Sequence, residues 1–134
     1  MGARPVIALA DAFLDEAEMY EASLRHEGFD VRMLTTLDVV VAAAQVHAIA
    51  PDAVLTRILP RRFGIELVTL LRRNPIMAER PLFILTSLSH HEAELRDARA
   101  CGATDVLLLP QSTQDLARLI RRCLRHPPRK VRPA

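Results

Sequence analysis

The stretch PDAVLTRILPRRFGIEL, Pro51–Leu67, joins a short apolar run to a loop and then to an amphipathic segment. The run AVLTRIL at 53–59 predicts a buried strand, and GIELVTLLRRN at 64–74 predicts a helix that stops before the next proline. A strand followed by a loop and a helix is the repeating unit of a parallel α/β sheet. In such a sheet, binding and catalytic sites form at the carboxyl ends of the strands.

The carboxyl end of this strand is unusual because no acidic residue lies between Asp52 and Glu66. The strand ends instead on Thr56 and Arg57. Asp52 precedes the strand, so we expect it at the opposite edge of the sheet. Any chemistry at the carboxyl end of this strand must therefore use a hydroxyl or a guanidinium in place of a carboxylate.

The same alternation of apolar runs and amphipathic segments extends over the rest of the chain. It predicts strands at 6–10, 29–34, 53–59, 81–87 and 105–110, and helices at 15–28, 37–50, 64–74, 91–102 and 113–125. The strands are mostly continuous apolar runs, which is typical of parallel strands covered on both faces. We therefore predict an α/β fold with one doubly wound, five-stranded parallel sheet.

Composition excludes several classes of protein. With 134 residues, half of them apolar, the chain has the size and core of one domain. Only 4% of its residues are aromatic, too few for a platform that stacks single-stranded bases. No apolar run approaches the length of a membrane span and no secretory signal opens the chain, so we expect a cytoplasmic protein without membrane contact. The two cysteines, Cys101 and Cys123, are expected to be free thiols.

Positive charge is concentrated at the C-terminal end. Seven basic residues and no acidic residue occur from Arg118 onward, whereas the preceding residues carry eleven basic side chains and all 16 acidic ones. Four arginines repeat at helical spacing on the last predicted helix: Arg118, Arg121, Arg122 and Arg125. Such a stripe favours an acidic protein surface first and a nucleic-acid backbone second, if it is more than a solvated face. We expect a domain over 1–126 and a mobile, basic, proline-rich tail over 127–134.

Several segments, taken together and in order, resemble the receiver domain of two-component response regulators over roughly residues 4–126. They are ALADAFLDEAEMYEASLRHEGFDV, PDAVLTRILPRRFGIELVTLLR, PLFILTS and GATDVLLLP. The resemblance implies a flavodoxin-like (βα)5 sheet with strand order 2-1-3-4-5. It also implies phosphorylation of an Asp at the end of the third strand, with Mg²⁺ held by an acidic pair after the first strand.

The chain departs from the family pattern at most of these chemical positions. Asp11 matches the first acid of the pair, but Ala12 stands at the second. The phospho-acceptor position falls on Arg57 when counted forward from Pro51 and on Thr56 when counted back from Pro60. The switch hydroxyl is kept as Thr86, whereas Leu109 stands at the lysine position and Val106 at the aromatic position.

These losses predict a protein that is neither phosphorylated nor an enzyme. Neither Thr56 nor Arg57 is a carboxylate nucleophile, and Asp11 alone is a weak candidate ligand for Mg²⁺, so we expect no metal and no cofactor. Two hypotheses describe the emptied pocket. In the first, Arg57 pairs with Asp11 and supplies a fixed positive charge; in the second, Arg57 points to solvent and Asp11 caps the loop. We expect Thr86 to make a local hydrogen bond.

The interpretation that follows is a degenerate receiver domain, or pseudo-receiver, that signals by binding proteins. The expected partner or dimer surface is the fourth helix, fifth strand and fifth helix, with Val106 and the four arginines. Two alternatives stay open. One is an unusual phosphate-dependent receiver of a phosphorelay that uses Thr56 or Asp11, and the other is a nucleic-acid-binding regulator that uses the basic last helix and tail.

Overall fold

A computed structural model of the chain describes residues 3–87, 92–109 and 112–125. Within them, five parallel strands form one sheet in the order β2-β1-β3-β4-β5, and five helices alternate with the strands. The strands are β1 (Val6–Ala10), β2 (Asp30–Leu34), β3 (Ala53–Arg57), β4 (Leu82–Ser87) and β5 (Asp105–Leu109). The helices are α1 (Leu14–His26), α2 (Val39–Ile49), α3 (Phe63–Arg72), α4 (Glu92–Ala100) and α5 (Thr113–Arg125). The predicted fold class and strand order are confirmed; the expected tail at 127–134 lies outside the described residues.

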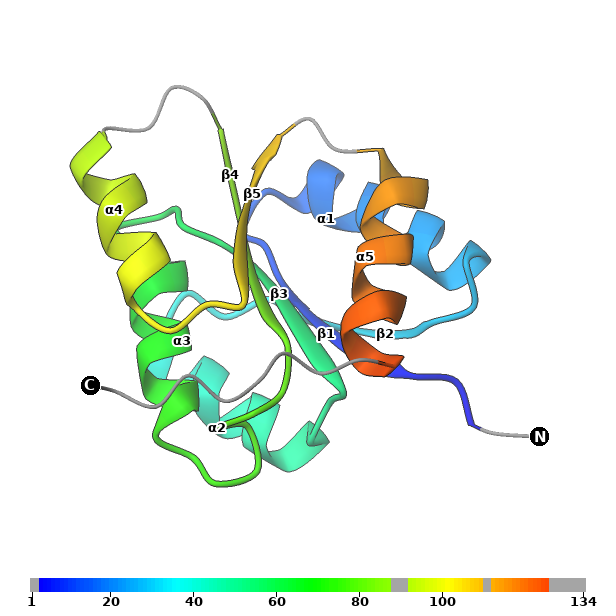
Figure 1. Ribbon diagram of the computed structural model, residues 1–134, viewed down its shortest axis with the longest axis horizontal. Coiled ribbons are helices and arrows are strands. Elements are labelled where there is room, and N and C mark those ends of the chain that lie inside the picture. Colours follow the sequence, from blue (N-terminus) through cyan, green and yellow to red (C-terminus); the bar gives the residue numbers. More distant parts are fainter. Residues whose placement is uncertain (1–2, 88–91, 110–111, 126–134) are drawn as a thin grey trace.

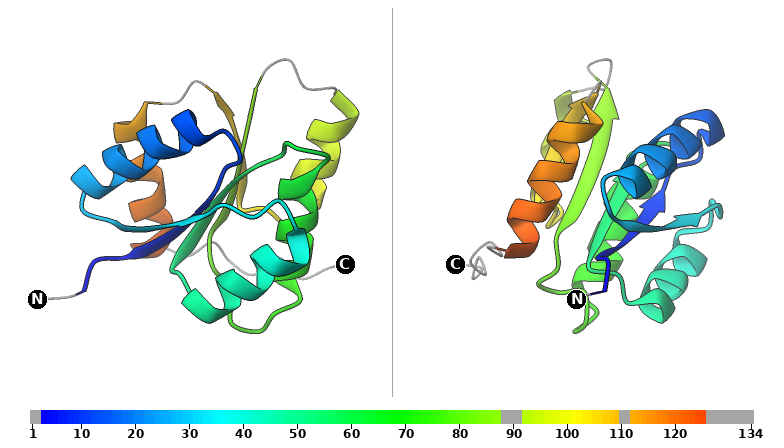
Figure 2. Two further views of the ribbon diagram at one scale, coloured as in Figure 1. Left: turned by 180° about the vertical axis from the view of Figure 1, so that it is seen from behind. Right: turned by 90° about the vertical axis from the view of Figure 1, so that its right-hand side faces the viewer.

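Helices cover both faces of the sheet, with α1 and α5 on one face and α2, α3 and α4 on the other (Figures 1 and 2). The alternation of side chains along β1 shows why two cores form. Ile7 and Leu9 join the cluster beneath α1 and α5, whereas Ala8 and Ala10 join the cluster beneath α2 and α3. Because both faces are buried, the strands must be apolar at almost every position, as the sequence predicted.

Local sequence explains which side of α1 is buried and where α2 begins. Ala17, Tyr20 and Leu24 form the buried side of α1, as their spacing predicted. The valine run that opens α2 is helical because Asp38 caps it: its carboxylate accepts the backbone N–H groups of Val40 at 2.9 Å and Val41 at 3.1 Å.

The corner between β3 and α3 is tight, and a glycine makes it possible. Arg61 and Arg62 both adopt the left-handed backbone conformation, with φ of 49° and 63°. Their turn brings the first residues of α3 back against the end of β3, where the Gly64 N–H donates to the Ile58 carbonyl at 3.1 Å. A Cβ atom at Gly64 would overlap the carbonyl oxygen of Arg57. The carboxyl end of β3 is therefore held in place by backbone contact with α3.

Gly64→Ala tests this close approach. Helix propensity alone predicts that alanine would stabilise α3 by up to ~1 kcal/mol. We expect the opposite, a loss of about 1–3 kcal/mol in the free energy of unfolding, because the backbone of β3 and α3 must separate. Urea denaturation measures the change, with Glu66→Ala, an exposed position in the same helix, as the matched control. A stabilised Gly64→Ala variant would contradict the contact.

Candidate functional site

The side chains at the carboxyl edge of the sheet divide between its two faces. Arg57 follows Leu55 in the alternation along β3, and Asp11 follows Leu9 beyond β1, so both face the α1 and α5 layer. Thr56 lies in the alternate row, beside Ala10 of β1. Asp11 and Arg57 therefore lie on the same face of the sheet at its carboxyl edge. Of the two candidates for the phospho-acceptor position, Arg57 lies on this face and Thr56 on the other.

Arg57 is buried, with 8% of the residue exposed, so the hypothesis that it points to solvent is wrong. Its ion pair is formed with Glu16 of α1, not with Asp11 as the other hypothesis held: Arg57 Nε lies 3.3 Å from Glu16 Oε1. The guanidinium also lies 5.2 Å from the ring centroid of Phe13, within the range of a cation–π contact. Arg57 is thus held by the start of α1.

Asp11 has a different role, which explains why it is not the direct partner. Its Oδ1 accepts the backbone N–H of Phe13 at 2.9 Å and so fixes the turn that leads into α1. The capping part of the second hypothesis is therefore confirmed. That turn carries Phe13 and Glu16 to Arg57, so Asp11 supports the ion pair indirectly.

Four polar atoms of this cluster are buried without a hydrogen-bond partner among the described residues: Asp11 Oδ2, Glu16 Oε1, and Arg57 Nε and Nη1. The Arg57–Glu16 contact is consequently an ion pair whose N–H is not aligned for a hydrogen bond. Two carboxylates share the neighbourhood of one guanidinium. Burial of such groups is costly unless charge and hydrogen bonding are balanced, so a proton is the simplest way to balance them.

The protonation of Glu16 reflects this arrangement. Burial, followed by a hydrogen bond with Asp11 and the charge of Asp11, raises the pKa of Glu16, while Arg57 opposes these effects, and together they bring the pKa from 4.5 to about 7. Burial, followed by the charge of Glu16, raises the pKa of Tyr20, one helical turn along α1, to about 12. Near neutral pH the cluster therefore holds a proton on Glu16 for part of the time, and Tyr20 stays neutral.

The two hydroxyl residues predicted for the pocket, Thr56 and Thr86, do not form an activated nucleophile. Thr56 is fully buried, and its Oγ1 donates to the Arg57 carbonyl at 3.2 Å. Thr86 is also fully buried, but its Oγ1 has no hydrogen-bond partner among the described residues. The prediction that Thr86 makes a local hydrogen bond is therefore wrong, because its buried hydroxyl group has no acceptor in the part of the chain that the structure describes.

The remaining predicted pocket residues lie as follows. Ala12 is exposed, and Leu109 at the end of β5 is half-buried against the α1 and α5 layer. Val106, in β5, is half-buried against the opposite layer. Leu109 thus contributes hydrocarbon at a position where the family resemblance implies a lysine.

The predicted arginine stripe on α5 is only partly available as a surface. Arg118, Arg122 and Arg125 are exposed, and Arg118 makes a surface ion pair with Asp115 at 3.4 Å. Arg121 is instead engaged within the domain. It donates to the backbone carbonyl of Glu27, lies 3.7 Å from the Glu27 carboxylate and stacks 5.1 Å from the centroid of the Phe29 ring. Arg121 therefore ties α5 to the end of α1, while its side chain stays partly exposed beside the other arginines of the predicted partner surface.

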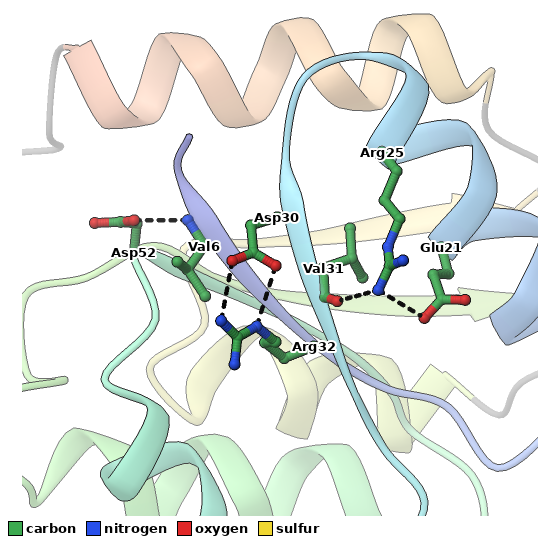
Figure 3. Close-up of polar contacts among 7 residues, drawn as sticks. All are labelled: Val6, Glu21, Arg25, Asp30, Val31, Arg32 and Asp52. Carbon is green, nitrogen blue, oxygen red and sulfur yellow. Dashed lines mark hydrogen bonds and ion pairs between the residues drawn. The ribbon is translucent and has the colours of Figure 1, made fainter. Parts of the chain in front are cut away.

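Asp52 lies at the opposite, amino edge of the sheet, as predicted (Figure 3). Its Oδ2 accepts the backbone N–H of Val6 at 2.7 Å. Close by on β2, Arg32 pairs with Asp30 at 3.1 Å. The Asp52 hydrogen bond joins the starts of β1 and β3, the Arg32–Asp30 pair lies within β2, and neither contributes a group to the carboxyl-edge cluster.

Comparison with known proteins places this geometry in context. No protein-family model matches the sequence, and no curated protein gives a significant match. Among solved structures, a response regulator from Chloroflexus aurantiacus is 27% identical, with a TM-score of 0.80 over 92% of this chain and 99% of that one.

The receiver domain of a histidine kinase from Syntrophus aciditrophicus is 22% identical, with a TM-score of 0.81 over 97% of each chain. The chain has the receiver-domain fold. A third match is the receiver domain of a sensor histidine kinase from Pseudomonas aeruginosa, 23% identical with a TM-score of 0.80, covering 91% of this chain and 98% of that one. That protein coordinates a magnesium ion in its active-site cleft.

The residues of this receiver-like domain do not fit a magnesium ion in the same way. No group of three or more His, Cys, Asp or Glu side chains within the described ranges is arranged to hold a metal. The two carboxylates at the carboxyl edge, Asp11 and Glu16, already have the Arg57 guanidinium beside them, and a divalent cation would be repelled by it. The charge that Mg²⁺ would bring is supplied in part by a side chain.

No helix in the described part of the chain is long and apolar enough to cross a bilayer.

Sequence reasoning missed Glu16, the direct partner of Arg57. A signal for it was present: Glu16 precedes Tyr20 by four residues, and residues at that spacing share one face of a helix. Because Tyr20 was predicted to face the core, Glu16 falls at the edge of the same buried side. A partly buried carboxylate at that position needs a cation nearby.

Arg57→Met should destabilise the domain, since it removes the cation and leaves two poorly solvated carboxylates. We expect a loss of about 1–3 kcal/mol in the free energy of unfolding at pH 8 and a smaller loss at pH 5.5, where Glu16 is protonated. Chemical denaturation at both pH values measures this. Arg61→Met, an exposed position in the next loop, is the control, and equal stability of the Arg57 variant and the wild type at pH 8 would refute the structural role.

Glu16→Gln should change the pH dependence of stability. A carboxyl group whose folded pKa is raised, here to about 7 from 4.5, gives its full stabilisation below pH 4.5 and loses it as pH rises through 7. The wild type should therefore lose on the order of 2 kcal/mol between pH 5 and pH 8 through this group. The Gln variant should show a flatter profile. Glu18→Gln, at an exposed site on α1, should keep the wild-type profile; if Glu16→Gln keeps it as well, the assignment fails.

Proposed function

We propose that the chain is a receiver-like signalling module that acts in the cytoplasm by binding proteins, without phosphorylation of an aspartate and without enzymic activity. The observation that carries the proposal is the buried Arg57 at the carboxyl end of β3, paired with Glu16. A guanidinium cannot accept a phosphoryl group as a carboxylate does. Its positive charge also lies in the region where an acyl phosphate would have to form and where its counter-ion would have to bind.

The surrounding groups support the same proposal. Thr56 uses its hydroxyl to donate to a backbone carbonyl, and among the described residues no histidine or carboxylate forms a hydrogen bond with it as a base would. Leu109 offers no charge to balance a phosphoryl group. An unusual phosphate-dependent receiver would need a nucleophile that neither residue provides.

A protein partner is favoured over nucleic acid by the way the arginines are used. Arg121 is bound to the end of α1, and Arg118 has an acidic neighbour on its own helix. The exposed Arg122 and Arg125 therefore form a small basic surface beside β5 rather than a long stripe that could follow a phosphate backbone. An acidic patch on a signalling partner that docks across α4, β5 and α5 fits a surface of this size.

A two-dimensional ¹⁵N–¹H amide spectrum tests the proposal directly. We expect the amides of Asp11, Arg57, Thr86 and Leu109 to stay in place when Mg²⁺ and then beryllofluoride, a mimic of the acyl phosphate, are added. Saturable shifts of these amides that require Mg²⁺ would overturn the proposal. They would instead support a phosphate-dependent receiver.

The triple variant Ala12→Asp, Arg57→Asp and Leu109→Lys is a positive control for the assay, because it restores the family's chemical groups at the positions that the resemblance assigns. Its response to beryllofluoride would show that the scaffold can present a working site and that the wild type fails for want of these side chains. If the variant does not fold, a receiver domain with an intact acidic pair and acceptor Asp serves as the control.

A further inference from the structure

The outward side of α2 is apolar, although it is exposed to solvent. Val40 is 67% exposed and Val41 44%, and Leu37 just before the helix is 60% exposed. Ala44 and Ala48 continue the same side at helical spacing and are also exposed. A helix at the surface of a monomer normally turns charged residues outward. Residues 39–49 contain no acidic residue, lysine or arginine, so α2 has one apolar side in the core and a second in water.

A hollow of about 450 Å³ lies beside this exposed side, where the start of α2 meets the loop after β3. Its apolar lining comes from Leu37, Val39, Pro60 and Phe63, and its charged lining from Arg61 and Glu66. Arg61 and Glu66 are exposed, and the structure gives neither an ion pair with another described residue. One surface thus carries an apolar projection, an apolar hollow, a cation and an anion.

These four features make the surface complementary to itself. In a two-fold dimer each contact occurs twice, with residue i of one subunit on residue j of the other and the reverse. A projection and a hollow on one patch can interlock in this way, and so can an unpaired Arg61 and an unpaired Glu66. The uncharged side of α2 also places no like charges against each other. We propose that a second copy of this chain docks on this surface, which we call the α2 surface (Leu37, Val40, Val41, Arg61, Phe63 and Glu66), with Arg61 of each copy facing Glu66 of the other.

This α2 surface lies on the face of the sheet opposite the Arg57–Glu16 pair and α5. α2 packs on the face of the sheet opposite α5, and Figure 1 shows the two helices on different sides of the molecule. A dimer formed through α2 would therefore leave the exposed arginines of α5 free on both subunits. The patch is small compared with a standard protein interface, so the dimer should be weak and concentration-dependent.

Sedimentation velocity over a concentration series tests the dimer. We expect the wild type to shift from monomer toward dimer as concentration rises into the high micromolar range. Val40→Glu should weaken association at least tenfold, because it places a charge in the apolar contact while remaining compatible with the first turn of a helix. Met19→Glu on α1, where Met19 is 46% exposed, is the matched control and should associate like the wild type.

A charge exchange identifies the occupant. Arg61→Glu and Glu66→Arg should each weaken self-association, since each puts like charges together. The double variant should recover it, and so should an equimolar mixture of the two single variants, in which both pairs are again complementary. Only a contact between two copies of this chain predicts recovery in the mixture.

Three results would overturn the proposal: a wild type that is monomeric throughout, association that Val40→Glu leaves unchanged, or single charge variants whose loss is not recovered by mixing. A monomeric wild type would mean that this α2 surface meets a different molecule or none. Circular dichroism of each variant separates loss of association from loss of fold.

Discussion

A guanidinium buried at the end of β3 is the constraint around which the functional edge of this domain is organised. The backbone of Arg57 is held in place, because Gly64 has no side chain and the start of α3 therefore lies directly against the Arg57 carbonyl group. Its charge must then be met where it stands. Glu16 and the ring of Phe13 meet it from the start of α1, and Asp11 holds the turn that brings them there. The geometry of two strand ends and one helix start thus follows from one cation.

The balance of charge in this cluster is close but incomplete. Two ionised carboxylates and one guanidinium leave an excess negative charge in a region where water has little access, which is why burial and Asp11 together raise the pKa of Glu16 to about 7. A proton removes the excess. Near neutral pH the charge of this edge therefore depends on the protonation of Glu16 beside Arg57. In the receiver domain from Pseudomonas aeruginosa, by contrast, a magnesium ion is coordinated in the active-site cleft.

The fold could be predicted from the sequence almost completely, whereas the site could be predicted only in part. Parallel strands buried on both faces leave continuous apolar runs in the sequence, and a proline marks where the third helix stops. The partner of Arg57 depended instead on how α1 is rotated at its first turn, which decides between Asp11 and Glu16. Thr86 illustrates the same limit: its position at the end of β4 was evident, but the absence of a hydrogen-bond partner for its hydroxyl among the described residues is a property of the packed structure. Arg121 belonged to a regular stripe in sequence, yet its contacts with Glu27 and Phe29 depend on how α5 packs against the end of α1.

This division between fold and site has a physical reason. The stability of the sheet rests on two apolar clusters that lie beneath the helices and contain none of the charged residues of the carboxyl edge. Side chains at the strand ends can therefore exchange a carboxylate for a guanidinium while the layers remain unchanged, provided that the new charge finds a partner. A match to the receiver fold consequently says little about phosphotransfer in this chain, because the fold and the chemistry depend on different residues. What the domain does must be inferred from Arg57 and its neighbours, where a cation of the chain itself lies against the Glu16 carboxylate.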